Sequence, residues 1–338
     1  MTISLTTYEY RVREWILDLV HGQWLTLGVP FSVRRAHPDE IIDPEALLWC
    51  SLEFFPTQPR LQEQVLIWRA RHADSLLLSR LRRFAQSTAD PRAILWQSLD
   101  PHWKATPKPP TEPCYAQASL GELQAFCRDL SNYVATWLSQ PVQAGKVKPT
   151  LRELLNECLG TSQRLQIAKA ESTCAATLLR ARDVLGTDVR HFLLVYLLAN
   201  QSGARLRSVA QWSGQTYQNI AKAAKRWEAA NVVTLDRGFA RLKNPAVWAD
   251  ILGIGPVTSQ PLVLVNWPRF FDACITLLRY LAKANAKSLP ADGPVVAGLI
   301  RQALEDAAAS VESATPSHTV RDFANVLLTL SEKAQGTL

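Results

Sequence analysis

The stretch from Val189 to Asn244 decides the fold, and it reads VRHFLLVYLLANQSGARLRSVAQWSGQTYQNIAKAAKRWEAANVVTLDRGFARLKN. Its apolar opening predicts a helix over Val189–Ala199, and a shorter helix is expected at about Leu206–Trp212. Ser213-Gly214 indicates a tight turn, because glycine readily adopts the positive φ that such turns require. A long helix from about Thr216 to Asn231 and two β-prone runs complete the pattern, the runs being Val232–Leu235 and Phe239–Leu242.

The order of these elements predicts a DNA-binding fold. The two β-prone runs are separated by Asp236-Arg237-Gly238, and punctuation of the Asp-Gly type is typical of a β-hairpin. Helix, helix, turn, helix and hairpin is the order of a winged helix-turn-helix, in which the second helix of the pair enters a DNA major groove. The sequence therefore predicts a winged helix-turn-helix with a small β-wing at 187–244.

The long helix has two chemically different faces. Apolar side chains recur at three- and four-residue spacing, which places them on one side: Tyr217, Ile220, Ala223, Ala224, Trp227 and Ala230. The amides of Gln and Asn pair with adenine, and Lys or Arg with guanine or phosphate. Thr216 is expected at the helix start, where its hydroxyl caps free N–H groups. We expect the second face, with Thr216, to meet the major groove: Gln215, Gln218, Asn219, Lys222, Lys225 and Arg226.

Positive charge is concentrated in the same stretch. The chain has a net charge of +7, and residues 203–243 hold eight basic residues against Glu228 and Asp236, so nearly all of the excess lies there. Such confinement is the electrostatic pattern expected for phosphate contact. We expect Arg237 and Arg241 on the wing to contact the DNA backbone or minor groove, and Arg205 and Arg207 to hold phosphates. The alternative interpretation is a solvated basic face with no ligand.

The stretch resembles bacterial winged-helix regulators of the MarR and ArsR kind. In that family a helix ending in Leu-Leu precedes a helix-turn-helix and an Ala-Gly-Val-Val entry to the wing. Asn231 stands in place of the usual glycine here, and asparagine also tolerates a left-handed backbone. The resemblance depends on Leu197-Leu198, Val209-Ala210, Gly214, Ile220 and Ala230-Asn231-Val232-Val233. It implies a transcriptional regulator that binds DNA as a dimer.

A wider resemblance covers most of the chain. The chain looks like mostly helical bacterial proteins that place such a winged helix between helical regions, and some proteins of comparable layout act as antitoxins encoded beside toxins. The residues that match are Leu47-Leu48, Arg60-Leu61, Val65-Leu66, Trp68, Arg80-Leu81 and the segment Trp267–Leu281. This likeness implies a partner protein encoded nearby as an alternative role.

The flanks predict a mainly α protein. Apolar stripes indicate a helical N-terminal domain over 1–99, although Trp24–Phe31 is expected to be a strand or extended segment because it is short and β-prone. Five prolines between Asp100 and Pro113 indicate a linker at 100–118. A helical connector is expected at 119–186, and a helical C-terminal region, with possible dimerisation surfaces, at 245–338.

Composition limits the classes of function. The chain is 47% hydrophobic and 20% charged, which fits a folded protein with a sizeable core. Its six cysteines are scattered without a CxxC pair, so neither a zinc site nor a disulfide framework is indicated. No signal-peptide core or long apolar span occurs, so we expect a cytoplasmic protein with reduced thiols and no membrane partner.

The candidate catalytic residues have simpler structural explanations. The histidines are isolated, and no Walker or GxGxxG loop occurs, so no metal, cofactor or enzymatic activity is predicted. The acidic cluster Asp39, Glu40, Asp43 and Glu45 is explained by a favourable charge at a helix N-terminus, with acid–base chemistry as the alternative. Core packing is expected for the tryptophans of the N-terminal half, and a ligand pocket is the alternative: Trp24, Trp49, Trp68, Trp96 and Trp103.

These observations predict sequence-specific binding of double-stranded DNA by a homodimeric transcriptional regulator, a repressor. One alternative is a protein-interaction scaffold, or an antitoxin-like partner of a neighbouring toxin or defence protein, because winged helices are reused for other tasks. A nucleic-acid-processing enzyme with an undetected carboxylate pair is a further alternative.

Overall fold

A computed structural model of the chain describes residues 5–31, 40–72, 75–86, 90–99, 174–254, 262–286, 294–310 and 317–335. Helices make up most of these residues, and the strands form one small sheet. The predicted mainly helical fold is therefore confirmed. None of the described helices is long and apolar enough to cross a membrane. The predicted linker at 100–118 and most of the predicted connector at 119–186 lie outside the described residues.

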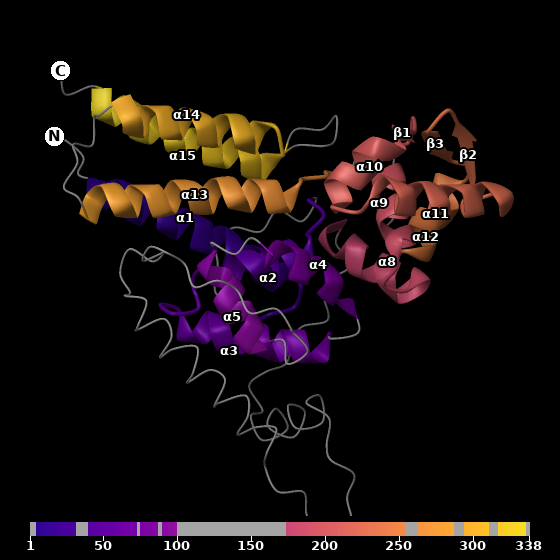
Figure 1. The fold of residues 1–338 in the computed structure, drawn as a ribbon, viewed down its shortest axis with the longest axis horizontal. Coiled ribbons are helices and arrows are strands. Elements are labelled where there is room, and N and C mark those ends of the chain that lie inside the picture. The colour runs from indigo at the N-terminus through magenta and orange to yellow at the C-terminus, as the bar shows by residue number, and fades with distance from the viewer. Residues whose placement is uncertain are drawn as a thin grey trace, which may run out of the picture.

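The described elements gather at two ends of the molecule (Figure 1). We call residues 174–254 the sheet unit and the remaining described residues the helical body. The helical body contains α1 (Leu5–Thr26), α2 (Pro44–Ser51), α3 (Pro59–Arg71), α4 (Leu78–Phe84), α5 (Pro91–Leu99), α13 (Trp267–Ala286), α14 (Pro294–Ala308) and α15 (His318–Gln335). The sheet unit contains a 3-10 turn (Cys174–Ala176), α8 (Thr177–Leu185), α9 (Val189–Ala199), β1 (Ala204–Arg205), α10 (Leu206–Ser213), α11 (Tyr217–Ala229), β2 (Val233–Asp236), β3 (Phe239–Leu242) and α12 (Pro245–Ile251).

Helix α1 and the C-terminal helix α13 of the helical body run side by side. In Figure 1, α1 lies along α13, with α14 and α15 packed above them. Trp15 of α1 lies with its ring centroid 4.9 Å from that of Phe323 in α15, and Phe270 of α13 lies 5.6 Å from the same ring. Residues that the sequence assigns to separate N-terminal and C-terminal regions thus share one hydrophobic core.

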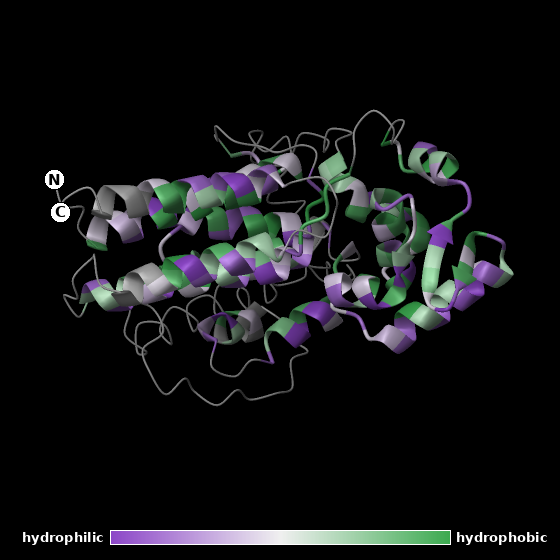
Figure 2. Cartoon of the chain, turned by 90° about the horizontal axis from the view of Figure 1, so that it is seen from above, coloured by the Kyte–Doolittle hydropathy of each residue, from purple (hydrophilic) through white to green (hydrophobic). Residues whose placement is uncertain are grey.

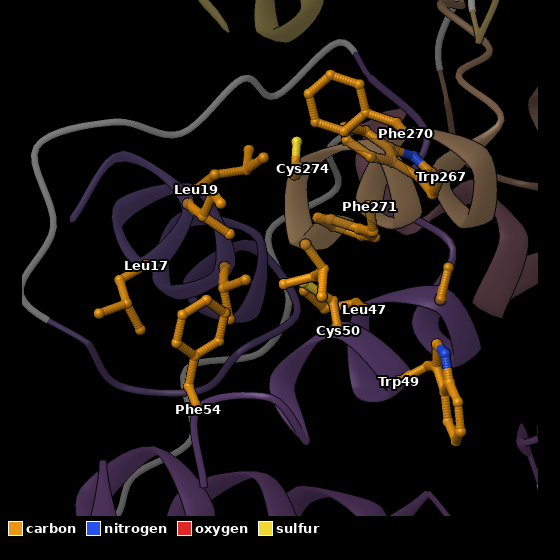
Figure 3. Close-up of a cluster of buried hydrophobic side chains, with 14 of the residues drawn as sticks. Leu17, Leu19, Leu47, Trp49, Cys50, Phe54, Trp267, Phe270, Phe271 and Cys274 are labelled. Carbon is orange, nitrogen blue, oxygen red and sulfur yellow. The ribbon is translucent and has the colours of Figure 1, made fainter. Parts of the chain in front are cut away.

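Helix α2 completes this core between α1 and α13. Figure 3 shows Leu47 and Cys50 of α2 beside Phe271 and Cys274 of α13, and all four side chains are buried. Figure 2, coloured by hydropathy, agrees with this: apolar residues gather where the long helices face one another. Burial raises the pKa of the Cys50 thiol far above its ordinary value, so this cysteine stays a neutral packing residue.

The tryptophans of the helical body pack in its interior. Trp24, Trp68 and Trp96 are each 0% exposed, and Trp49 is 4% exposed. Two indoles also satisfy their N–H groups: Trp24 donates to the Ser51 hydroxyl at 2.8 Å and Trp68 to the Leu27 carbonyl at 3.0 Å. The prediction of core packing is confirmed for these four residues, while Trp103 lies outside the described part of the chain.

The strand or extended segment predicted at Trp24–Phe31 is wrong for its first three residues, which belong to helix α1. Helix α1 continues to Thr26, because Trp24 extends the buried stripe of the helix by a further turn. The helix then stops at Gly28, which has a φ of 88°. The Val29 amide donates to the Trp24 carbonyl at 2.9 Å, the bond that closes a glycine-terminated helix end. The β-propensity of these residues was outweighed by the packing of α1 against α2 and α13.

Within the sheet unit, the predicted elements occur close to where the pattern places them. Helix α9 spans Val189–Ala199 and strand β3 spans Phe239–Leu242, both as predicted. Helices α10 and α11 and strand β2 differ from the predicted bounds by one or two residues. The three-stranded sheet has the order β1-β3-β2, and both pairings are antiparallel. The two-residue strand β1 was not predicted.

Gly203 fixes the place where β1 joins the sheet. Its φ is 101°, and an added Cβ would lie 2.8 Å from the Ala240 carbonyl oxygen and 2.5 Å from the Phe239 ring. Only glycine permits this close approach of two backbones. The contact brings Ala204 opposite Ala240 and Arg205 opposite Phe239, so the loop after α9 is held against the hairpin.

Candidate nucleic-acid interface

Helix α11 is fixed in the sheet unit by its apolar face. Ile220, Ala223, Ala224 and Trp227 are buried against α9, α10 and β2. The turn before it contains Gly214 at a φ of 64°, as the sequence predicts. Thr216 caps the helix, because its hydroxyl accepts from the Asn219 amide at 3.3 Å. The orientation of α11 is thereby set from both its side and its start.

The opposite face of α11 is open to solvent. Gln218, Lys222, Lys225 and Arg226 are exposed, as are Asn219 and Thr216, while Gln215 is half-buried. In Figure 1, α11 lies at one end of the molecule, close to the strands β2 and β3 of the hairpin. The sequence-predicted groove residues of this helix therefore lie on one accessible face, at about 100° per residue around the axis.

Two residues assigned to the apolar face of α11 are not buried. Tyr217 is 49% exposed, and Ala230 follows the end of the helix and is also exposed. The Tyr217 hydroxyl lies 3.5 Å from the position that a Cβ on Gly238 would take. Tyr217 thus stands between the start of α11 and the hairpin turn. Its spacing placed it at the edge of the apolar stripe, where period alone does not decide burial.

The hairpin turn has the geometry of a tight two-residue loop. Arg237 and Gly238 have φ values of 44° and 81°, and positive φ at both central residues is the type I′ pattern that matches strand twist. The Leu206 amide donates to the Gly238 carbonyl at 2.9 Å, so the turn is tied to the start of α10. Arg237 consequently sits at an exposed tip whose backbone is fixed.

The sheet gathers two predicted arginines on its solvent face. Arg205 pairs with Phe239, and Arg241 follows two residues along β3, so the alternation of the strands places all three on the same face. All three are exposed. The Arg241 guanidinium also donates to the Ser202 carbonyl at 2.9 Å. Arg207 is exposed on α10, and no described contact joins it to these residues.

The basic residues of this surface carry uncompensated charge. All eight in residues 203–243 are exposed, and none forms an ion pair with a carboxylate in the described part of the chain. Glu228 and Asp236 are exposed too and leave these cations unpaired. A surface of this kind attracts polyanions and releases counterions when it binds them.

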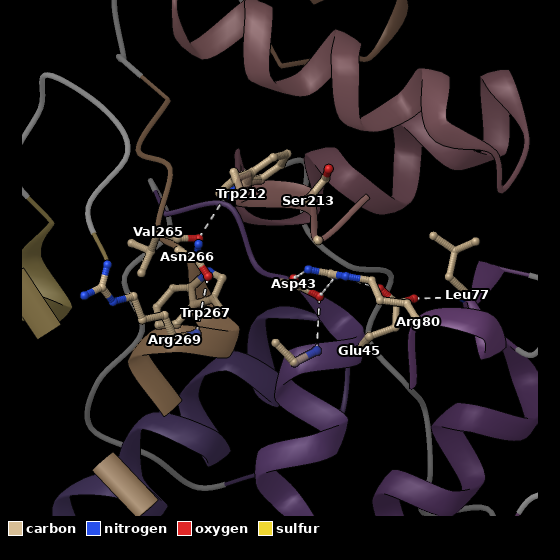
Figure 4. A network of polar contacts seen from close by, with 12 residues as sticks. Asp43, Glu45, Leu77, Arg80, Trp212, Ser213, Val265, Asn266, Trp267 and Arg269 are labelled. Atoms are coloured by element: carbon tan, nitrogen blue, oxygen red, sulfur yellow. Dashed lines mark hydrogen bonds and ion pairs between the residues drawn. The ribbon is translucent and has the colours of Figure 1, made fainter. Parts of the chain in front are cut away.

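A different set of charges joins the sheet unit to the helical body, and Figure 4 shows its three members from the helical body, Asp43, Glu45 and Arg80. Arg80 of α4 binds Asp43 through two bonds of 2.6 Å and reaches Glu45 at 3.2 Å. Arg182 of α8 grips Glu45 from the other side with bonds of 2.7 and 2.8 Å. We call these four residues the buried joint. Burial alone raises the pKa of Glu45, but Arg182 and Arg80 outweigh it and leave that pKa below its ordinary value.

The buried joint corrects the interpretation of the acidic cluster. Asp43 does cap α2, accepting from the Ala46 amide at 3.1 Å, as expected for a helix start. Glu45, however, binds a guanidinium 137 positions away in sequence. Glu40 accepts from the Thr319 amide at 2.9 Å and the Ser317 hydroxyl at 2.7 Å, so it serves the start of α15. Asp39 lies outside the described residues.

His191 borders the buried joint. Its Nε2 accepts a hydrogen bond of 3.2 Å from Arg182, and its ring is fully buried against Phe192. Burial and the neighbouring Arg182 lower its pKa well below the ordinary value. A neutral imidazole that accepts from a guanidinium is a structural partner, which agrees with the expectation for an isolated histidine.

Sequence reasoning missed one residue beside the helix-turn-helix. Arg83 of α4 donates to the carbonyl oxygen of Gly214, the turn residue before α11. Arg83 is half-buried. The run Ser79-Arg80-Leu81-Arg82-Arg83 was the available signal. Because α4 lies far from the turn in sequence, only the packing of the two parts brings them together.

The described residues offer no metal cluster: no group of three His, Cys, Asp or Glu side chains among them is placed to hold an ion. A hollow of about 460 Å³ opens between α13 and α14. Its charged residues include Arg269 and Asp306, which pair with each other at 3.2 Å. None of the sequence-predicted site residues lines it.

Known proteins add no constraint on this interface. Comparisons with models of protein families, with curated proteins and with solved structures gave no match to this chain. The assignment of the interface therefore depends on its own geometry and charge.

Proposed function

We propose that residues 187–244 act as a winged helix-turn-helix that binds double-stranded DNA, and that the protein is a transcriptional repressor. In this proposal α11 enters the major groove, and the β2–β3 hairpin is the wing. Gln218 and Asn219 read base edges, and Lys222 and Arg226 contact guanine or phosphate.

The observation that carries the proposal is a set of eight exposed cations on α10, on α11 and in or beside the strands, none of which pairs with a carboxylate among the described residues. Exposed cations without carboxylate partners lose little when they meet a phosphate, since no internal ion pair has to break first. Each phosphate contact releases counterions and makes binding weaken with salt. The rigid tip at Arg237 and the fixed axis of α11 would add little conformational cost on binding.

Modules of this kind read one half-site each, and two-fold operators are bound by dimers. We therefore propose a homodimer as the DNA-binding form. Sedimentation of the full chain with a duplex from its own upstream region distinguishes one bound chain from two. A single bound chain at saturating protein would remove the dimer from the proposal and leave DNA binding in place.

The decisive experiment replaces Lys222 and Arg226 by alanine in the full chain. Fluorescence anisotropy with the upstream duplex, repeated over a range of KCl concentrations, gives affinity and salt slope. Losing two phosphate contacts is expected to reduce the slope of log K against log salt by about 2, since each contributes about 0.9. The double variant Lys283→Ala, Arg301→Ala removes the same charge from exposed positions of α13 and α14 and is expected to bind as the wild type does. Unchanged affinity and slope in the α11 variant would contradict the assigned face.

A second candidate function is protein binding through the sheet unit. Helix α12 exposes Val247 and Ile251, 56% and 50% accessible and one turn apart, and exposed apolar pairs favour protein contacts. This role would be favoured over DNA binding if the chain bound no duplex at any salt concentration and a partner protein stayed bound during purification.

A further inference from the structure

Helix α4 lies against the turn that leads into the proposed recognition helix. It belongs to the helical body, yet Arg83 reaches the carbonyl oxygen of Gly214, and the Arg80 Nε lies 3.9 Å from the position of a Cβ on the same glycine. Two guanidinium groups from a distant part of the sequence therefore flank the α10–α11 turn.

The two arginines differ in how their charge is balanced. Arg80 is 1% exposed and is held by Asp43 and Glu45, so its charge is neutralised inside the protein. Arg83 forms no ion pair with a carboxylate in the described part of the chain, and a backbone carbonyl is its described partner. Burial and the neighbouring Arg80 lower the pKa of Arg83, although an arginine keeps its charge at neutral pH.

The hydrogen bond to Gly214 leaves most of the Arg83 guanidinium available. A guanidinium has five N–H donors in a planar fork, and the half-buried group is described with one of them in use. A planar fork of this kind binds phosphate through two parallel bonds. The partner that fits an unpaired guanidinium at this position is an anion with several oxygen atoms.

The position relative to α11 identifies that anion. When a recognition helix lies in a major groove, the phosphate backbone passes along the turn and the preceding helix. We propose that α4 is part of the DNA interface and that Arg83 holds a backbone phosphate beside the α10–α11 turn. This inference depends on the proposed function. It makes the helical body a direct contributor to DNA affinity.

The test compares Arg83→Ala and Arg83→Lys with the wild type in the full chain. Binding of the upstream duplex and of a duplex of scrambled sequence is followed by anisotropy at several KCl concentrations. A phosphate contact carries no sequence information, so Arg83→Ala is expected to weaken both duplexes by a similar factor, roughly fivefold. Its salt slope should fall by about 0.9, and Arg83→Lys should recover most of that slope.

Two controls keep the outcomes apart. Arg301→Ala removes one exposed charge from α14 and should leave both curves unchanged. Thermal unfolding reports whether loss of the Gly214 bond loosens the turn. If Arg83→Ala lowers the unfolding midpoint and the affinity while the salt slope stays at the wild-type value, Arg83 is structural and the inference is overturned. Wild-type affinity and slope in Arg83→Ala would overturn it as well. If the wild type itself shows no salt-dependent binding to either duplex, the proposed function fails and this inference fails with it.

Discussion

At the buried joint, Arg80 and Arg182 are 1% and 2% exposed; Arg80 is held by the carboxylates of Asp43 and Glu45, and Arg182 by that of Glu45. On α11 and the hairpin, the cations are exposed and have no carboxylate partner among the described residues. A guanidinium removed from water needs an internal partner to offset its lost hydration, whereas one left in water does not. The same residue type therefore serves cohesion in one region and is available for an external anion in the other.

The largest effect is expected at the buried joint. Arg182→Met leaves Glu45 buried with Arg80 as its remaining charged partner, and breaking a buried pair on one side costs about 3–5 kcal/mol. Urea unfolding of the full chain measures the loss. The matched control is Arg190→Met, an exposed arginine paired with Asp188 at 2.5 Å, for which a change below about 1 kcal/mol is expected. Equal losses of unfolding free energy in the two variants would contradict the distinction between the arginines of the buried joint and exposed arginines.

An effect of intermediate size on stability is expected when the pH is lowered, because Asp90 is paired with Arg92 and Arg279. Burial raises the pKa of Asp90, but Arg92 and Arg279 more than offset this and hold that pKa at about 2, below the ordinary value for an aspartate. Because the folded pKa is the lower one, the stabilisation is complete above pH 4 and is lost as the pH falls towards 2. The difference amounts to about 2 kcal/mol. Asp90→Asn should remove this part of the pH dependence, and an unchanged pH profile of unfolding in that variant would contradict the ion pairing.

The smallest effect on stability is expected at the tip of the hairpin. Arg237 is exposed and forms no described ion pair, so replacing its side chain should change the free energy of unfolding by less than about 0.5 kcal/mol. Its φ of 44° favours Asn as the replacement. We expect Arg237→Asn to leave the free energy of unfolding nearly unchanged and to lower the affinity for the upstream duplex, and both quantities are measured. A clear loss of stability in Arg237→Asn would mean that exposed cations also hold the fold.

Helices α9, α10 and α11 of the sheet unit were predictable because their apolar residues follow clear local patterns. Val189–Ala199 is mainly apolar, and α11 has a buried stripe at three- and four-residue spacing. Strand β1 has two residues, too few to show an alternation, and it exists because Gly203 lets the backbone approach β3. Tyr217 was misassigned because an edge position in the first turn is decided by its neighbours.

The buried joint and the contact between α4 and the turn before α11 were beyond prediction for a different reason. Glu45 and Arg182 are separated by 137 positions, and Arg83 and Gly214 by 131. No local pattern records which distant segments meet, so a single sequence showed the acidic cluster and the arginine run without their partners. The exposed face of the proposed interface depended only on local period and charge, and it was therefore accessible to sequence reasoning.

The packing of α1 against α13 has a consequence for how the chain acquires its fold. Contacts inside the sheet unit join near neighbours in sequence, such as α8 with α9 and β2 with β3, and such local contacts form quickly. Helix α1, in contrast, cannot meet α13 before the whole sheet unit has been synthesised. During synthesis the sheet unit is thus expected to fold first, while the apolar stripe of α1 still lacks its main partner. Pulse-labelling hydrogen exchange would detect this order as early protection in α9 and α11 and late protection in α1.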